Sequence, residues 1–235
     1  MRITVKDTSS GFLAEQKRTG RRIRLSVAAA LTRTAVKIKA AEVELMQRKL
    51  DRPKPFTLNS LQVKPATLDK PEASVETKEG FGSVPAGRFL SPLVEGGTRR
   101  MKSSELQLVT RGTSSYYVPG EFADLDQYGN IRGSVISKIL SQLKLRRDAS
   151  QNATSSKRSG AKRKSQAFFL KGNIVFLRVR EYPAKGDRED QTKPYLFLIN
   201  APRYKPILPF FDVAQEVTDQ HLATEFGKAF DEFAD

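Results

Sequence analysis

The stretch RIRLSVAAALTRTAVKIKAAEVELMQRKL, residues 22–50, decides the fold. Its apolar residues recur at steps of three and four, which is the period of a helix with one apolar stripe. The stripe consists of Val27, Leu31, Ala35, Ile38, Ala41, Leu45 and Met46. The positions between them predict a solvated opposite face, which includes Arg33, Lys37, Lys39 and Glu42. A helix of this length must bury its stripe, and we expect it to pack on a sheet.

Capping and stop signals mark the ends of this helix. Ser26 is suited to cap the first turn, and Arg48 and Lys49 suit the negative C-terminal end of the helix dipole. Pro53 cannot continue a helix, so the helix is predicted to end before it. Residues 7–20 are polar and have no apolar period, and we expect a loop there with a single helical turn.

Alternation of apolar and polar residues predicts strands along the rest of the chain. The predicted strands are residues 2–6, 61–63, 73–77, 106–110, 167–170, 174–179 and 195–199. Residues 65–71 join the second and third of these into a long polar hairpin, and Lys171-Gly172-Asn173 closes a tight one. A hairpin with one weakly apolar face seldom stands alone in water, so we expect the first hairpin to lie against a neighbouring subunit or a sheet.

Further helices and loops follow from periodicity and from turn residues. The predicted helices are residues 88–95, 134–145 and 212–233. The predicted loops are residues 80–87, 116–133 and 182–194. Ser134 is suited to cap the second helix, and Gly96 to end the first. Pro119-Gly120 and residues 127–130 are predicted turns.

Together these elements predict an α+β fold. A mainly antiparallel sheet is packed by the long N-terminal helix and by a C-terminal helix, with an extended hairpin beside them. We interpret residues 1–235 as a single elaborated domain, interrupted by a basic insertion at residues 146–166.

Composition limits the classes of function. The formal net charge is +15, from 41 basic and 26 acidic residues. Such an excess favours contact with nucleic acid or with acidic protein surfaces. The absence of cysteine excludes disulfides, cysteine-ligated metals and thiol catalysis, and is compatible with assembly in a reducing cytoplasm. We expect neither a signal peptide nor a membrane span, because no apolar run is long enough for either.

The basic insertion is the one candidate interaction element. Its cations are Arg146, Arg147, Lys157, Arg158, Lys162, Arg163 and Lys164, and they lie among small polar residues without an apolar period. Side chains of this kind neutralise DNA phosphates in a salt-sensitive contact that is indifferent to sequence. A solvated flexible loop explains the same composition, and both interpretations stay open here.

No motif indicates catalysis, a cofactor or a metal. His221 is the only histidine, and one histidine without cysteine cannot build a usual zinc site. Asp124 and Asp126 lack the glycine and the closing glutamate of a calcium loop, so turn and capping roles are expected of them. Neither a Gly-x-Ser-x-Gly elbow nor a phosphate-binding loop occurs. We therefore expect a chain that is not an enzyme.

Four short segments carry a family resemblance. They are VAAALTRTA at residues 27–35, RKLDRP at 48–53, LVEGGTRR at 93–100 and DQYGNIRG at 126–133. The first two, followed by a polar hairpin, resemble the N-terminal half of phage minor tail protein Z and related tail-completion or neck proteins. The last two look like segments of tail or virion proteins of tailed phages. The chain departs from this family in its glycine-punctuated centre and in the basic insertion.

The resemblance implies a structural virion protein of the tail or neck, assembled in the host cytoplasm. Members of the family form rings at the head–tail junction, through which DNA passes. The implied partners are further copies of the chain, portal or adaptor proteins, tail-tube proteins and, by non-specific contact, packaged DNA. The alternative, from another class, is a sequence-independent DNA-binding protein that acts through the basic insertion.

Overall fold

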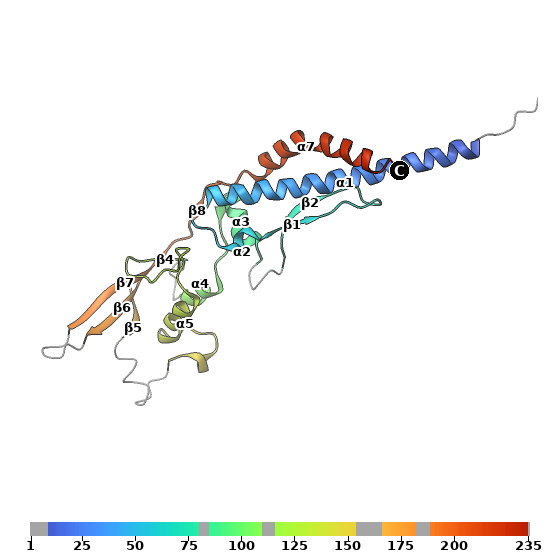
Figure 1. Ribbon diagram of the computed structural model, residues 1–235. Helices are drawn as coiled ribbons and strands as arrows, with labels where there is room; N and C mark the ends of the chain where they lie inside the picture. The colour runs from blue at the N-terminus through green and yellow to red at the C-terminus, as the bar shows by residue number, and fades with distance from the viewer. Residues whose placement is uncertain (1–8, 80–84, 110–115, 154–165, 182–188, 235) are drawn as a thin grey trace, which may run out of the picture. The chain divides into compact units, whose positions relative to one another are not determined.

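The computed structural model describes residues 9–79, 85–109, 116–153, 166–181 and 189–234 (Figure 1). By its internal contacts the chain divides into two compact units. The first, the helical unit, consists of Met1–Val94 and Pro206–Asp235, and the second, the sheet unit, of Glu95–Lys205. The sheet unit is thus inserted into the chain of the helical unit. That residues 1–235 behave as one domain stays a prediction, and the strand predicted at residues 2–6 lies outside the described part.

Two long helices, α1 (Ser9–Lys49) and α7 (Phe210–Glu232), form the frame of the helical unit. They lie side by side along α7, with the N-terminal part of α1 extending beyond it (Figure 1). The C-terminal helix was predicted to within two residues at its start. The helix that packs along α1 is therefore α7, the last helix of the chain.

The start of α1 differs from the prediction. Residues 9–20 are helical, so the loop predicted there is wrong from Ser9 onward. The segment AEQK, residues 14–17, consists of strong helix formers, which extend a helix even where no apolar stripe exists. Ser26 is not a cap, because it lies inside the helix and its hydroxyl donates to the Arg22 carbonyl at 2.9 Å.

The buried face of α1 matches the predicted stripe only in part. Ala35, Leu45 and Met46 of the stripe are buried, but Ser26, Ala30 and Thr34, which lie outside it, are buried as well. Glu42 was assigned to the solvated face, and this is wrong, because only 5% of it is exposed. It lies four residues after Ile38 and four before Met46, so helical geometry places it on the buried side.

The chain leaves α1 as predicted, after a last turn that holds Arg48 and Lys49. A short helix, α2 (Pro55–Leu58), leads into the hairpin of β1 (Leu61–Lys64) and β2 (Ser74–Thr77). The two strands are antiparallel and pair Val63 with Val75, which confirms the predicted hairpin. Its apolar face packs on α1, so the hairpin covers the helix of its own chain.

A small core joins these elements. Leu45 and Met46 of α1 pack with Leu61 of β1, with Leu90 of α3 (Gly87–Val94) and with Leu208. The helix α3 matches the predicted helix at residues 88–95. The N–H groups of Ile207 and Leu208 both donate to the Leu93 carbonyl, at 2.8 and 3.0 Å, which ties the returning chain to the end of α3.

The sheet unit is built on a four-stranded antiparallel sheet of order β4-β7-β6-β5. Its strands are β4 (Tyr116–Pro119), β5 (Gln166–Lys171), β6 (Ile174–Glu181) and β7 (Glu189–Ile199). The short strands β3 (Gly97–Thr98) and β8 (Arg203–Tyr204) pair separately. Gly172 has a φ of 57° and closes the predicted tight hairpin between β5 and β6.

The helix α5 (Gly133–Gln142) packs on the sheet. Its Ile139 and Leu140 are buried with Val175 of β6 and Leu196 of β7. The Gln142 side-chain oxygen accepts from the Phe168 N–H at 2.7 Å, which ties the helix to the edge strand β5. The strands β5 and β6 and this helix were predicted to within a few residues.

Four expectations for the sheet unit were wrong. Residues 103–108 form the helix α4 (Ser103–Leu108) where a strand was predicted. The strand β4 lies in the segment expected to be all turns, and β7 begins at Glu189, inside the predicted loop at 182–194. Ser134 makes no cap, because Arg132 holds the N-cap position of α5. For β4 and β7 the pairing with distant strands, not the local pattern, decided the outcome.

The fold class is α+β, as predicted, with antiparallel sheets and with long helices near both ends of the chain. Within the helical unit, α1 packs on α7 and on the two-stranded hairpin. Among the described residues, no helix combines the length and the hydropathy that a membrane crossing requires.

Candidate functional site

The C-terminal end of α7 is held by one arginine of α1. Arg22 donates two hydrogen bonds to the Phe230 carbonyl, from Nε at 2.9 Å and from Nη2 at 2.6 Å. Its guanidinium also lies 3.8 Å from the centre of the Phe230 ring. A cation at the last carbonyls of a helix is favoured by the helix dipole and satisfies an orphan acceptor. Arg22 thus ties the last turn of α7 to α1.

Ion pairs extend this contact along the two helices. Arg33 binds Glu232 at 2.5 Å, and Lys37 lies 3.5 Å from Glu225. Glu225 is 6% exposed and also binds Lys228 at 3.3 Å. Burial alone raises the pKa of Glu225, but the hydrogen bonds and charges of Lys228 and Lys37 outweigh it and lower that pKa.

These pairs show what covers part of the predicted solvated face of α1. Arg33 and Lys37 were predicted to lie on that face. Both are paired with carboxylates of α7. A sequence pattern shows which positions of a helix are charged, but it does not show whether a second helix covers them.

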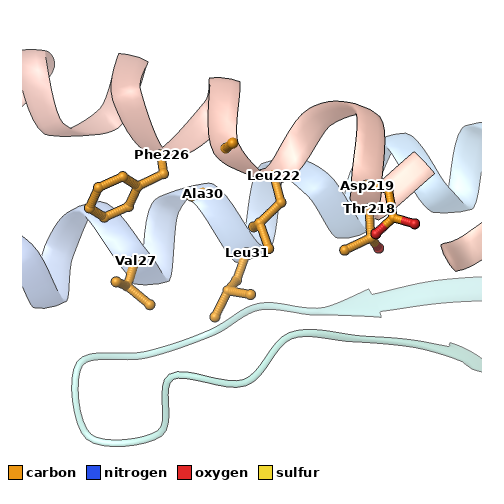
Figure 2. Close-up of a pocket in the computed structure, with 8 residues that line it drawn as sticks. Val27, Ala30, Leu31, Thr218, Asp219, Leu222 and Phe226 are labelled. Atoms are coloured by element: carbon orange, nitrogen blue, oxygen red, sulfur yellow. The ribbon is translucent and has the colours of Figure 1, made fainter. Parts of the chain in front are cut away.

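An apolar groove lies where α1 and α7 meet. Its volume is about 500 Å³, and its lining residues are Val27, Ala30, Leu31, Thr218, Asp219, Leu222, Ala223 and Phe226. Figure 2 shows Val27 and Leu31 of α1 near Leu222 and Phe226 of α7. The side-chain polar groups of the lining are the Thr218 hydroxyl and the Asp219 carboxylate. The groove is thus suited to hold apolar side chains, and its lining offers no pair of groups for acid–base chemistry.

A second apolar surface lies at the start of α7. Phe211 is 74% exposed and Ile207 is 40% exposed. Both line a cavity of about 670 Å³ whose other lining residues are Val94, Pro206, Leu208 and Pro209 and the charged Lys49 and Asp212. Large exposed apolar side chains that gather on one surface mark interaction sites more often than chance would place them there.

The candidate DNA-facing residues of the basic insertion divide into two groups. Arg146 and Arg147 lie in the described segment that ends at residue 153. Lys157, Arg158, Lys162, Arg163 and Lys164 lie outside the described residues. Of the seven cations, the structure therefore places Arg146 and Arg147.

The described start of the insertion is folded. The Arg146 N–H donates to Asn152 Oδ1 at 3.1 Å, and the Ala153 N–H donates to the Ser141 carbonyl at 3.0 Å. Arg146 is half-buried, and its Nε makes no hydrogen bond to the described part of the chain. Arg147 is exposed. Residues 146–153 thus close onto the end of α5, whereas residues 154–165 of the predicted insertion lie outside the described part of the chain.

The most ordered polar cluster lies in the sheet unit, around Glu105. Glu105 is fully buried and accepts two bonds from Arg99, at 2.7 and 2.5 Å, and one from the Lys102 N–H at 2.6 Å. The Tyr116 hydroxyl donates to the Arg99 carbonyl at 2.7 Å, and the Arg99 guanidinium lies 4.8 Å from its ring. The hydrogen bond to Glu105 is the largest cause that raises the pKa of Arg99.

This cluster is structural. Its carboxylate is saturated by partners of its own unit, and those partners join the segment after β3 to α4 and β4. It explains why residues 103–108 are helical, because Glu105 reaches back to the N–H that precedes the first turn. Arg99 was noted in the sequence only as part of a family motif, and no local pattern signals its partner.

The acidic loop at residues 124–130 has the turn role expected of it. Asp126 Oδ1 accepts from the N–H groups of Tyr128 and Asn130, at 3.0 and 2.9 Å. The Asp124 N–H donates to the Tyr195 hydroxyl at 3.1 Å. Within the described segments, no group of three His, Asp or Glu side chains is arranged to hold a metal ion.

The features that bear on function are thus the α1–α7 groove, the surface around Phe211 and the basic insertion. All three are suited to contact other macromolecules by shape, apolar area or charge. No protein-family model, no curated protein and no solved structure matches this chain.

Proposed function

We propose that this chain is a structural virion protein of the tail-completion or neck type. Its copies form a ring that joins head and tail parts around the DNA channel. The observation that carries the proposal is the uncovered apolar surface of the helical unit, which consists of the groove at Leu222 and the surface around Phe211. The resemblance of residues 27–35 and 48–53 to minor tail protein Z supports the same function.

The two apolar surfaces suit a ring better than a two-fold dimer. A ring needs heterologous contacts, in which one surface of a subunit binds a different surface of the next. The α1–α7 groove is a concave acceptor for apolar side chains, whereas Phe211 is a projecting aromatic ring. A heterologous contact requires two different surfaces on each subunit, and this chain has one concave and one projecting apolar surface.

Charge supports a place beside DNA. The net charge of +15 remains after the pairs between α1 and α7 have formed, since ion pairing leaves the sum unchanged. Part of the excess lies in the insertion at residues 146–166. A ring whose channel carries such cations attracts the phosphate backbone without reading its sequence.

Mass photometry of the full-length protein tests the proposal. We expect discrete oligomers of one size, alone or after addition of portal and tail-tube proteins. Leu222→Gln should weaken these oligomers, because it places an amide in the apolar groove. Gln220→Leu, at an exposed position of the same helix, is the matched control and should leave them intact. A protein that stays monomeric in every mixture contradicts the proposal.

The basic insertion favours a second candidate, a sequence-independent DNA-binding protein. The deletion that tests it removes residues 154–164. It keeps residues 146–153, because Ala153 is bonded to Ser141 of α5 and Arg146 is bonded to Asn152. Loss of salt-sensitive duplex binding with intact oligomers assigns the insertion to DNA. Unchanged duplex binding excludes this candidate.

A further inference from the structure

Glu42 is a buried carboxyl on the inner side of α1. It lines a cavity of about 240 Å³ that is separate from the α1–α7 groove. The other lining residues are Ile38, Leu61, Val75, Thr77, Val94, Phe210, Phe211 and Ala214. The walls thus come from α1, the β1-β2 hairpin, the end of α3 and the start of α7, and they are apolar except at Glu42 and Thr77.

The Glu42 carboxyl has no partner in the described part of its own chain. No described residue donates a hydrogen bond to it or forms an ion pair with it. Burial raises the pKa of Glu42 to about 7, and no nearby cation opposes that rise. A buried carboxyl without a partner is costly, so natural cores seldom keep one where an apolar residue would pack.

The cavity lies next to the exposed apolar surface. Phe211 lines both this cavity and the adjoining one of about 670 Å³, and 74% of it is exposed. Ile207, 40% exposed, lines the adjoining cavity. A macromolecule that covers this apolar surface would therefore also reach the Glu42 cavity.

We propose that the Glu42 cavity receives a lysine side chain from a second copy of this chain. The apolar walls suit the four methylenes of lysine, and the carboxylate suits its ammonium group. The inference rests on the proposed function only in that it requires copies of the chain to associate.

Charge complementarity identifies the occupant as another copy. The chain has 41 basic residues against 26 acidic ones, so its surface offers many lysines and few carboxylates to receive them. A carboxylate held in an apolar cavity beside exposed aromatic surface is a specific acceptor for one of these lysines. The contact is heterologous, since a buried carboxyl on one copy meets a lysine from a different surface of the next.

The test compares the association of full-length Glu42→Gln and wild type at pH 8 by mass photometry and sedimentation velocity. Glutamine keeps the size of the side chain and removes its charge. We expect the dissociation constant between copies to rise at least tenfold, with the circular dichroism spectrum unchanged. Glu44→Gln is the matched control, because Glu44 is exposed on the same helix, and it should associate like wild type.

A second measurement identifies the lysine. Mixed light- and heavy-isotope copies are treated with a carbodiimide, which joins a carboxyl to an amine in direct contact. We expect cross-linked peptides that contain Glu42 of one isotope and a lysine of the other. Such peptides should be absent from the Glu42→Gln protein.

The outcomes separate this inference from the proposed function. If wild type and Glu42→Gln form the same oligomers with equal affinity, the lysine contact is wrong and the proposed ring is unaffected. Cross-links from Glu42 to lysines of its own copy only also overturn it. A wild-type protein that never associates overturns both.

Discussion

At the scale of single residues, two positions carry unusual environments. Glu42 is a carboxyl among apolar side chains, with its pKa raised to about 7. Gly120 has no room for a side chain, because a Cβ there would lie 2.6 Å from the Pro194 carbonyl oxygen. Each position is explained by its neighbours in space, and each gives a test of the structure.

Glu42→Gln should stabilise the monomeric protein at high pH. The carboxyl titrates near 4.5 when exposed and near 7 when folded, so the folded state holds its proton more tightly. The stability contribution of this proton is complete below pH 4.5 and is lost as the pH rises through 7. Above 7 the variant should gain roughly 1–3 kcal/mol over wild type, at about 1.4 kcal/mol per pKa unit.

Urea unfolding at pH 5 and pH 8, at concentrations where both proteins are monomeric, measures this effect. The difference between Glu42→Gln and wild type should be small at pH 5 and larger at pH 8. Glu44→Gln should show no such change, because Glu44 is exposed. A Glu42→Gln effect of the same size at both pH values contradicts a raised pKa.

Gly120→Ala should destabilise the sheet unit by roughly 1–3 kcal/mol, the usual cost of overpacking. The N–H of Gly120 donates to the Tyr195 carbonyl at 2.8 Å, so the two backbones cannot separate without loss of this bond.

Gly227→Ala is the opposite case, because nothing lies within 4 Å of the added Cβ in α7. It should stabilise the protein by about 0.5–1 kcal/mol. Thermal unfolding of Gly120→Ala and Gly227→Ala measures both changes in stability. Equal changes in the two variants would contradict the structure.

At the scale of elements, the pairing of α1 with α7 is the main contact of the helical unit. Arg22 binds the carbonyl at the end of α7, and Arg33 and Lys37 bind its carboxylates. Ala30 of α1 and Ala229 of α7 are buried, and apolar residues of both helices line the groove. Polar contacts and apolar packing thus both hold the pair together.

Arg22→Ala should loosen the end of α7 without unfolding the chain. The Phe230 carbonyl loses both of its side-chain donors, and the Phe230 ring loses the guanidinium that lies against it. Hydrogen exchange of residues 226–232 should accelerate about fivefold to twentyfold, equivalent to roughly 1–2 kcal/mol. Arg21→Ala, at an exposed neighbouring position, is the control. Unchanged exchange in Arg22→Ala would mean that other contacts hold this end of α7.

At the scale of the whole molecule, the sequence of the sheet unit interrupts the sequence of the helical unit. The core around Ile139 and Val175 lies entirely within Glu95–Lys205. The core around Met46 lies entirely within the flanking segments. Separate cores predict that each unit is able to fold without the other.

Replacement of residues 95–205 by a short Gly-Ser linker should leave the helical unit folded. The Leu93 carbonyl accepts from the Ile207 and Leu208 N–H groups, so the two ends that the linker joins are already adjacent. Residues 95–205 alone should unfold in one cooperative transition. Circular dichroism and urea unfolding of both proteins provide the measurement. Failure of both pieces to fold would support the single domain that the sequence predicts.

By itself, the sequence determined the elements whose signals are local. The helix at residues 22–50, the hairpin at 61–77, the tight turn at Gly172 and the C-terminal helix all follow from periodicity and turn chemistry, because those signals act over a few residues. The α+β class follows from these elements. The lack of a catalytic motif and the excess of positive charge are likewise properties of the composition.

Only the tertiary structure decided which faces are covered. Arg22 and Phe230 are bonded across 208 residues, and no local pattern signals such a contact. The burial of Glu42 and the pairing of β4 with β7 likewise depend on partners that are distant in the sequence. The physical reason is that burial and pairing depend on the partner that a residue meets in space, whereas periodicity records only the residue's own side of a helix or strand.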